Sequence, residues 1–255
     1  MLRQALIIAA GKGVRLQPHG MHPKPLVPLA GRPLLEWVLR GVEQAGCTDA
    51  VVVVGYRAEE ITGFLRTYAG QLRCRWVHNP RFEGQNGLSV LAAAPLLQER
   101  FLLLMCDHIV EPELLCWLQR QPLPAQGIAL CVDFRLQRIL DLADATKVMV
   151  HEGRVRAIGK ELQAYNAVDT GVFVAGSALL TALQEVVETQ GDASLTDGVR
   201  RLAALGQVYA LDIGEHFWQD VDTPAMLAHA EQWLQRYGWK FERSKACSGT
   251  LGNLP

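Results

Sequence analysis

A glycine-rich loop that carries several positive charges follows the first apolar segment of the chain. The residues expected to surround a ligand there are Ala9, Ala10, Gly11, Gly13, Arg15 and Lys24. Glycines lack the Cβ atom that would keep the backbone away from a ligand, and successive backbone N–H groups in such a turn can bind phosphate oxygens. Arg15 and Lys24, together with Lys12, indicate a highly anionic ligand. The pattern therefore predicts a loop that wraps a nucleoside triphosphate.

Three other interpretations of this loop are weaker. A dinucleotide fingerprint needs a third glycine where Leu16 stands, and an acidic residue after the second strand, where Gly55 and Tyr56 stand. A P-loop needs a hydroxyl residue directly after its lysine, but Gly13 follows Lys12. A turn that binds no ligand is the third alternative and the least favoured.

Two carboxylates far apart in the sequence are candidates for a metal site. Asp107 follows the apolar segment 101–106, and Asp222 ends another predicted strand. Ligands of open α/β sheets gather at the carboxyl ends of the strands, and Mg²⁺ takes one or two carboxylates plus substrate phosphates. Asp220 shares a strand face with Asp222 and is a reserve ligand. The alternative for Asp222 alone is a helix cap, because a helix is predicted directly after it.

Several other polar side chains are candidates for substrate contacts. Lys160 ends the run 157–160 and is a natural partner for the phosphate of an acceptor, and Lys147 is a weaker candidate of the same kind. A solvated side chain is the alternative for both lysines. Gln85 and Asn86 precede a predicted helix and would read the edge of a nucleobase, unless Asn86 only caps that helix.

The elements that must position these residues alternate in the first half of the chain. Apolar runs predict strands at 4–10, 50–55, 73–78 and 101–106. Helical spacing predicts a helix between Pro33 and Gly46 and further helices at 58–68 and 87–97. This alternation favours a parallel α/β sheet.

After residue 107 the rhythm changes. Helices are predicted at 111–120, 177–189, 195–204 and 224–237. Strands are predicted at 127–134, 167–174, 208–213 and 216–221, and a β-hairpin at 146–151 and 155–159 turns at Glu152-Gly153. We expect one domain over residues 1–240, with a nucleotide-binding half at about 1–110, an acceptor-binding half at 111–240 and a tail at 241–255.

The composition argues against several classes of protein. The 255 residues are 49% hydrophobic and 20% charged, which allows a sizeable core. A net charge of −1 argues against a general binder of nucleic acid or of membrane surfaces. No apolar run approaches the roughly 20 residues that span a bilayer, and the N-terminus lacks a signal-peptide pattern. The six cysteines show no metal-binding spacing. We therefore expect a cytoplasmic protein without membrane insertion, and a homodimer remains open.

These motifs together resemble those of the sugar-phosphate nucleotidyltransferases. The first motif combines Gly11-x-Gly13-x-Arg15-Leu16-x-Pro18 with Pro23-Lys24-Pro25-Leu26. One branch, the inositol-1-phosphate cytidylyltransferases, is similar over nearly the whole chain. The matching stretches of that branch are Asn86-Gly87-x-Ser89, Met105-x-Asp107-His108, Ala145-Thr146-Lys147-Val148, Gly153-Arg154-Val155-x-x-Ile158-Gly159-Lys160, Val168-Asp169-Thr170-Gly171-x-Phe173-Val174 and Trp218-x-Asp220-Val221-Asp222-Thr223.

The resemblance implies a fold, a reaction and a site. The fold would be a Rossmann-like, mixed but mainly parallel sheet flanked by helices, with a small β-rich acceptor-binding part. The reaction would transfer CMP from CTP to a phosphorylated small alcohol, with Mg²⁺ as cofactor and pyrophosphate as the leaving group. The implied roles are triphosphate contacts for Arg15 and Lys24, metal ligation for Asp107 and Asp222, and acceptor contacts for Lys160, Asp169 and Thr170. Ser89, in a matching stretch, joins Gln85 and Asn86 as a candidate nucleotide contact, and Lys147 stays a weaker acceptor candidate.

The acceptor and the base stay open at this point. Inositol 1-phosphate is the acceptor that the resemblance favours, and phosphocholine, 2-aminoethylphosphonate or a sugar 1-phosphate are alternatives. A cationic acceptor would need an acidic or aromatic cage near Asp133, Asp169 or Trp218, whereas a polyol would need neutral hydrogen-bonding groups. Proteins that use GTP or UTP share the first loop. A non-enzymatic nucleotide-sensing module is a further alternative, which the joint presence of Lys24, Asp107 and Asp222 disfavours.

Overall fold

The apolar segments of the first half pair side by side as the alternating pattern predicts. The structure, a computed structural model, describes residues 1–16, 21–122 and 126–239. Strands β1 (Gln4–Ala9), β4 (Asp49–Val54), β5 (Arg73–His78) and β6 (Arg100–Met105) are parallel neighbours in the order β5-β4-β1-β6. Their carboxyl ends therefore meet at one edge of the sheet, from which the glycine loop and Asp107 both start.

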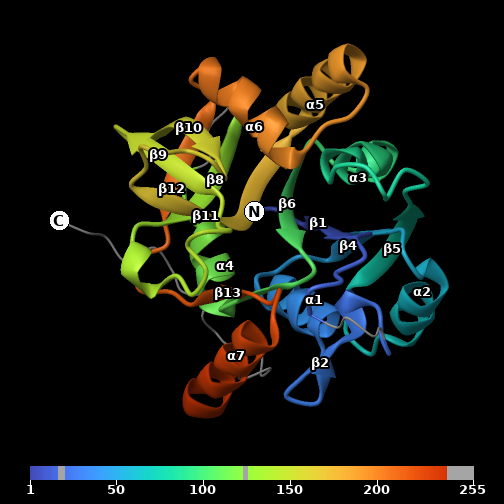
Figure 1. Cartoon of the computed structure of the whole chain (residues 1–255). Helices are drawn as coiled ribbons and strands as arrows, with labels where there is room; N and C mark the ends of the chain where they lie inside the picture. Colours follow the sequence, from blue (N-terminus) through green and yellow to red (C-terminus); the bar gives the residue numbers. More distant parts are fainter. Residues whose placement is uncertain (17–20, 123–125, 240–255) are drawn as a thin grey trace.

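Both faces of these strands are buried, which explains why the strands read as continuous apolar runs. In β1, Ala5 and Ile7 belong to one core cluster, whereas Leu6 and Ile8 belong to another on the opposite face. Helices α1 (Leu34–Gln44), α2 (Ala58–Thr67) and α4 (Pro112–Leu118) pack against the first face, and α3 (Gly87–Ala93), α5 (Ser177–Gln190) and α6 (Leu195–Ala204) against the second (Figure 1).

The second half of the chain extends the same sheet with mixed strand directions. Strand β11 (Ala167–Gly176) lies antiparallel between β6 and β8 (Ile128–Asp133). Strands β12 (Val208–Asp212), β10 (Arg154–Gly159) and β9 (Lys147–His151) complete nine strands in the order β5-β4-β1-β6-β11-β8-β12-β10-β9. The predicted fold, a mixed and mainly parallel sheet flanked by helices with a β-rich second half, is confirmed.

The predicted hairpin between β9 and β10 is also confirmed. Glu152 has a φ of 51° and Gly153 a φ of 68°, so both central residues of the turn are left-handed. This is the backbone pattern of a type I′ turn, whose twist matches that of the flanking strands.

Two short ribbons were not predicted. Strands β2 (Pro28–Leu29) and β3 (Arg32–Pro33) pair with each other, and β7 (His108–Val110) pairs antiparallel with β13 (Trp218–Asp220). The expected strand at 216–221 is thus only three residues long. The β7–β13 pairing matters for function, because it places the end of β13 beside the start of β7, directly after Asp107.

The last described helix, α7 (Pro224–Tyr237), packs on a third core cluster that includes Leu29 and Trp37. The predicted tail at 241–255 lies outside the described residues. In the described part of the chain, no helix is both long and apolar enough to cross a membrane.

The continuity of the sheet across β6 and β11 can be tested by one core substitution. Phe101 in β6 is completely buried, so Phe101→Ala is expected to lower the free energy of unfolding by about 3–5 kcal/mol. Leu205→Ala serves as the control, since Leu205 is 67% exposed and its loss should change stability by less than about 0.5 kcal/mol. Urea denaturation measures both values, and a loss below about 1 kcal/mol for Phe101→Ala would contradict this packing.

Candidate active site

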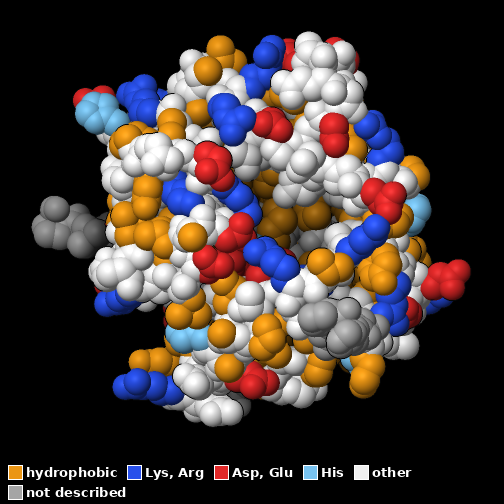
Figure 2. Space-filling view, viewed as in Figure 1, with side chains coloured by type: hydrophobic (Ala, Val, Ile, Leu, Met, Phe, Trp, Pro, Cys, Tyr) orange, Lys and Arg blue, Asp and Glu red, His pale blue; other side chains and the backbone are white. Residues whose placement is uncertain are grey.

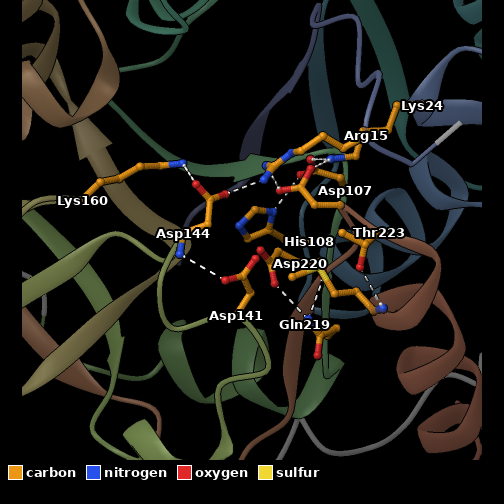
Figure 3. A network of polar contacts seen from close by, with 12 residues as sticks. Arg15, Lys24, Asp107, His108, Asp141, Asp144, Lys160, Gln219, Asp220 and Thr223 are labelled. Carbon is orange, nitrogen blue, oxygen red and sulfur yellow. Dashed lines mark hydrogen bonds and ion pairs between the residues drawn. The ribbon is translucent and has the colours of Figure 1, made fainter. Parts of the chain in front are cut away.

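The ammonium group of Lys24 lies between two carboxylates from distant parts of the chain. Lys24 begins the short 3₁₀ helix η1 (Lys24–Leu26) and is only 7% exposed. Its Nζ atom contacts Oδ2 of Asp107 and Oδ1 of Asp222. Figure 3 shows Lys24 directed at Asp107 across the carboxyl edge of the sheet. The structure therefore brings together the three residues on which the sequence-based hypothesis depends.

The β7–β13 ribbon and a helix cap fix the two aspartates. Asp107 stands between β6 and β7, and the backbone N–H of Val221 donates a hydrogen bond of 2.9 Å to its carbonyl oxygen. Helix α7 is capped by Thr223, whose hydroxyl accepts a hydrogen bond from the Met226 N–H. Asp222 is therefore not the cap, and its carboxylate is available to Lys24.

The charges in this cluster hold one another ionised. Burial by itself would lower the pKa of Lys24, but the carboxylates of Asp107 and Asp222 raise that pKa above its usual value. Burial would likewise raise the pKa of Asp107, and the charges of Lys24 and His108 lower it instead. Because each group would be costly to bury alone, the three charges depend on their mutual contact.

A second network of ion pairs connects this cluster to the acceptor-binding half. Arg15 donates through Nη2 to Asp222 at 2.7 Å and through Nη1 to Asp144 at 2.6 Å. Lys160 donates to the other oxygen of Asp144 at 2.5 Å. Figure 3 shows Asp144 between Arg15 and Lys160. The sequence analysis did not select Asp144, although it stands directly before the matching stretch at 145–148.

The glycine loop approaches Lys24 closely. Gly13 has a φ of +59°, and a Cβ atom built on it would lie 2.4 Å from the Cβ atom of Lys24. A side chain at this position would therefore push Lys24 away from its two carboxylates, in addition to the strain of the left-handed backbone.

A cavity of about 510 Å³ opens over this cluster. Residues of the glycine loop and residues from the second half of the chain both line it. Figure 2 shows a hollow whose rim carries Lys, Arg, Asp and Glu side chains. Of the sequence-predicted residues, its wall contains Gly11, Gly13, Arg15, Lys24, Asn86, Asp107, Lys160, Asp169, Asp220 and Asp222. A larger cavity of about 940 Å³ lies between β13 and α7, but Lys24 and Asp107 do not line it.

Thr170 and Lys147 do not line the site cavity, which corrects the predicted acceptor set. The hydroxyl of Thr170 is completely buried and donates to the Cys131 carbonyl at 2.8 Å. Lys147 is 8% exposed and donates to the Ala143 carbonyl at 2.6 Å. Both side chains therefore support the surrounding structure and face away from a ligand.

The candidate nucleotide-binding residues separate in the same way. Asn86 lines the cavity, and its Oδ1 accepts the N–H of Leu195 at 2.8 Å, which ties α3 to the start of α6. Ser89 is buried and accepts a hydrogen bond from Asn79. Gln85 is exposed and bonds through its backbone N–H to Asp192. Ala9 and Ala10 are buried at the end of β1, so only Asn86 of this set presents a side chain to the cavity.

The inner wall of the cavity is formed by polar groups around an aromatic pair. His108 contacts Asp107 at 2.7 Å and stacks on Trp218 with ring centroids 6.1 Å apart. Asp169 accepts the N–H of Gly171 at 2.7 Å, and burial raises the pKa of its carboxyl to about 6. Burial also raises the pKa of Asp220. Sequence reasoning missed Asp141, Thr146 and Thr196 on the same wall.

Comparison with known proteins assigns this architecture to a family. Residues 5–205 match the model of the MobA-like NTP transferase domain. The chain belongs to this NTP transferase family. The membership agrees with a glycine loop, a buried lysine and two convergent carboxylates at the carboxyl edge of the sheet.

Several individual proteins are similar to this chain over most of its length. A bifunctional IPC transferase and DIPP synthase of Rubrobacter xylanophilus is 38% identical over 239 residues, which cover 92% of this chain and 52% of that protein. The protein of the same name from Aquifex aeolicus is 31% identical, with coverage of 92% and 52%. The solved structure of the inositol-1-phosphate CTP transferase from T. maritima has a TM-score of 0.77 and 28% identity, and covers 91% of this chain and 97% of that chain. This NTP transferase thus spans about half the length of the curated relatives it matches.

The carboxylate pair of this NTP transferase fits a divalent cation that also binds phosphate. Asp107 and Asp222 already converge on one positively charged atom, the Nζ of Lys24. Over residues 1–16, 21–122 and 126–239, no group of three or more His, Cys, Asp or Glu residues is arranged to hold a metal. Mg²⁺ commonly binds through one or two carboxylates plus substrate phosphates. A cation at this site would therefore depend on the triphosphate for its remaining ligands.

The close approach of Gly13 to Lys24 yields a test by calorimetry. Gly13→Ala is expected to weaken the binding of nucleoside triphosphates at least tenfold, because the new methyl group displaces Lys24 from its charge-assisted contacts. Gly153→Ala is the matched control, since Gly153 is also left-handed at +68° but no atom lies within 4 Å of its added Cβ. Equal affinities in both variants would show that the contact with Lys24 is unimportant.

Proposed function

We propose that this chain transfers CMP from CTP to inositol 1-phosphate and releases pyrophosphate. The observation that carries the proposal is the convergence of Lys24, Asp107 and Asp222 at the mouth of the glycine loop. The relatives from Rubrobacter xylanophilus and T. maritima are named an IPC transferase and an inositol-1-phosphate CTP transferase, which supports the choice of substrates.

The roles of the residues follow from their charge and position. Lys24 binds the α-phosphate of CTP and offsets the charge that develops there during transfer. Arg15 binds the β- and γ-phosphates. Its guanidinium offers five N–H donors, and the carboxylates of Asp144 and Asp222 each accept one hydrogen bond from it. Asp107 and Asp222 hold Mg²⁺, with Asp220 in reserve.

The reaction needs positioning and charge neutralisation more than proton transfer. An oxygen of the acceptor phosphate attacks the α-phosphorus, a new P–O bond forms, and the bond to the β-phosphate oxygen breaks as pyrophosphate leaves. A phosphate monoester has a second pKa near ~6 and is largely dianionic at neutral pH, so no general base is required. Mg²⁺, when bound, supplies further charge neutralisation on the phosphates. Lys24 and Arg15 supply the rest in fixed positions.

The acceptor subsite offers groups for a phosphorylated polyol. Lys160 lies on the cavity wall and can bind the phosphate, and Asp169 can accept hydrogen bonds from hydroxyl groups. Of the groups that a cationic acceptor could use, Asp133 is nearly buried and already accepts hydrogen bonds from Arg135 and Trp218, whereas Asp169 and Trp218 line the cavity. The choice of inositol 1-phosphate therefore follows the name of the T. maritima relative, and phosphocholine and 2-aminoethylphosphonate stay alternatives.

The identity of the metal, the cellular location and the oligomeric state are further predictions. We infer Mg²⁺ as the metal and the cytoplasm as the location. A homodimer also stays a prediction.

A substrate grid tests the assignment directly. Four nucleoside triphosphates are combined with inositol 1-phosphate, glucose 1-phosphate, phosphocholine and 2-aminoethylphosphonate, and pyrophosphate release is measured with Mg²⁺. CTP with inositol 1-phosphate is expected to be the fastest pair, and chelation of the metal should abolish release. A faster reaction with another triphosphate or acceptor would refute the corresponding part of the assignment.

The role of Lys24 has its own test. Lys24→Met keeps most of the side-chain length but removes the charge, so kcat should fall about 100- to 1000-fold, as for the loss of one preorganised donor to a transition state. Arg156→Met is the control, because Arg156 is 47% exposed in β10 and lies outside the cavity wall. Circular dichroism should show intact secondary structure in both proteins. Turnover of Lys24→Met within threefold of the unmodified protein would exclude this role.

A further inference from the structure

The carboxylate of Asp144 has no place in the proposed reaction, yet it contacts two of its cations. Arg15 comes from the glycine loop and Lys160 from the end of β10, and both donate to Asp144, at 2.6 Å and 2.5 Å respectively. The hydrogen bond from Lys160, followed by that from Arg15, lowers the pKa of the Asp144 carboxyl, so the group is ionised at neutral pH. Two cations of the site are thus occupied by an anion that belongs to the protein.

These ion pairs are exposed enough to exchange with a ligand. The side chain of Lys160 is 53% exposed, that of Arg15 50% and that of Asp144 35%. Ion pairs in such positions contribute little net stability, because water and salt compete with them. A phosphate carries more charge than a carboxylate and has three acceptor oxygens, so it forms stronger charge-assisted hydrogen bonds with the same cations.

The backbone of the loop that carries Asp144 is held without the help of its carboxylate. Asp141 accepts the N–H of Asp144 at 3.2 Å through its side chain and the N–H of Ala145 at 3.0 Å through its carbonyl. Lys147 holds the carbonyl of Ala143 at 2.6 Å. The Asp144 side chain can therefore release its partners while the loop keeps its conformation.

We propose that Asp144 is an internal counter-anion of Arg15 and Lys160, and that the phosphate of the acceptor displaces it from Lys160. This inference rests on the proposed function for the identity of the acceptor. Asp144 is then a residue that sets acceptor affinity, and the space beside Lys160 is the phosphate subsite.

The charge of the phosphate changes during the reaction, so Asp144 competes differently with the substrate and with the product. The acceptor arrives with a dianionic phosphate, which competes well with one carboxylate for Lys160. Transfer converts that phosphate into part of a diphosphate diester, in which each phosphorus carries about one negative charge. The same carboxylate competes better with this product than with the substrate. Asp144 thus weakens substrate binding moderately and favours product release.

The test uses inorganic phosphate as the probe and titration calorimetry as the measurement, at pH 8 without nucleotide or metal. Asp144→Asn keeps the shape and removes the charge, and it should bind phosphate at least fivefold more tightly than the unmodified protein. Lys160→Met should weaken phosphate binding at least fivefold, and the double variant should bind no better than Lys160→Met alone.

Glu161→Gln is the matched control, because Glu161 is exposed and next to Lys160 in the sequence but lies outside the cavity wall. It should change phosphate affinity less than twofold. Equal tightening in Glu161→Gln and Asp144→Asn would overturn the proposal in favour of a general charge effect. Unchanged or weaker binding in Asp144→Asn would also overturn it.

The result is separable from the test of the proposed function. Pyrophosphate release by the unmodified protein with CTP and inositol 1-phosphate tests the reaction, and phosphate affinity in the Asp144 series tests the counter-anion. If the reaction fails but Asp144→Asn binds phosphate more tightly, the subsite stands and the acceptor was misassigned. If the reaction proceeds but the affinity does not change, the counter-anion is refuted alone.

Discussion

The contact of Lys24 with Asp107 and Asp222 is the constraint on which the rest of the site depends. A lysine side chain that is only 7% exposed would be strongly destabilising without partners, because desolvation of an unpaired charge costs several kcal/mol. Its two carboxylates lie 83 and 198 residues further along the chain. The fold must therefore bring three distant segments to one point, and a substitution in any one of them leaves the others uncompensated.

The sheet topology supplies that point in two steps. The parallel order β5-β4-β1-β6 places the ends of β1 and β6 side by side, which brings the glycine loop next to Asp107. The antiparallel β7–β13 ribbon then returns the chain from the second half, and Asp220 pairs with His108 in its register. Asp222 follows two residues later, at the start of α7. The ribbon is short, but its pairing brings Asp222 next to Asp107.

Local patterns were sufficient to predict the main sheet and the glycine loop, because continuous apolar runs and helical spacing are properties of short segments. The same reasoning placed Asp107 and Asp222 at strand ends. It predicted β13 as a longer strand at 216–221, but it could not predict β7, since a three-residue strand has too few positions for alternation to be visible. The pairing of these strands is a tertiary effect.

The acceptor residues show a second limit of prediction from sequence. Asp169 and Thr170 were both assigned to the acceptor, yet neighbouring residues of a strand point to opposite faces. Of these two residues, Asp169 lines the cavity, whereas Thr170 does not and its hydroxyl donates to the carbonyl oxygen of Cys131. Asp144 was missed for the opposite reason. Its contacts join residues 129 and 16 positions away, and no local pattern distinguishes it from a solvated loop aspartate.

The described site neutralises its own charges in both of its parts. Lys24 stands between the carboxylates that would hold a divalent cation, and Asp144 stands between cations that would hold phosphate. A protein that binds a triphosphate and a phosphate monoester needs clustered charges of both signs, and such clusters repel within themselves when the ligands are absent. Pairing the clusters with internal counter-charges lowers that repulsion. A ligand therefore has to displace ion pairs within the protein when it binds. The net binding energy is the difference between the contacts that the ligand forms and the internal ion pairs that it breaks. That difference is larger for the dianionic phosphate of the proposed substrate than for the diphosphate diester of the proposed product, and this asymmetry favours product release.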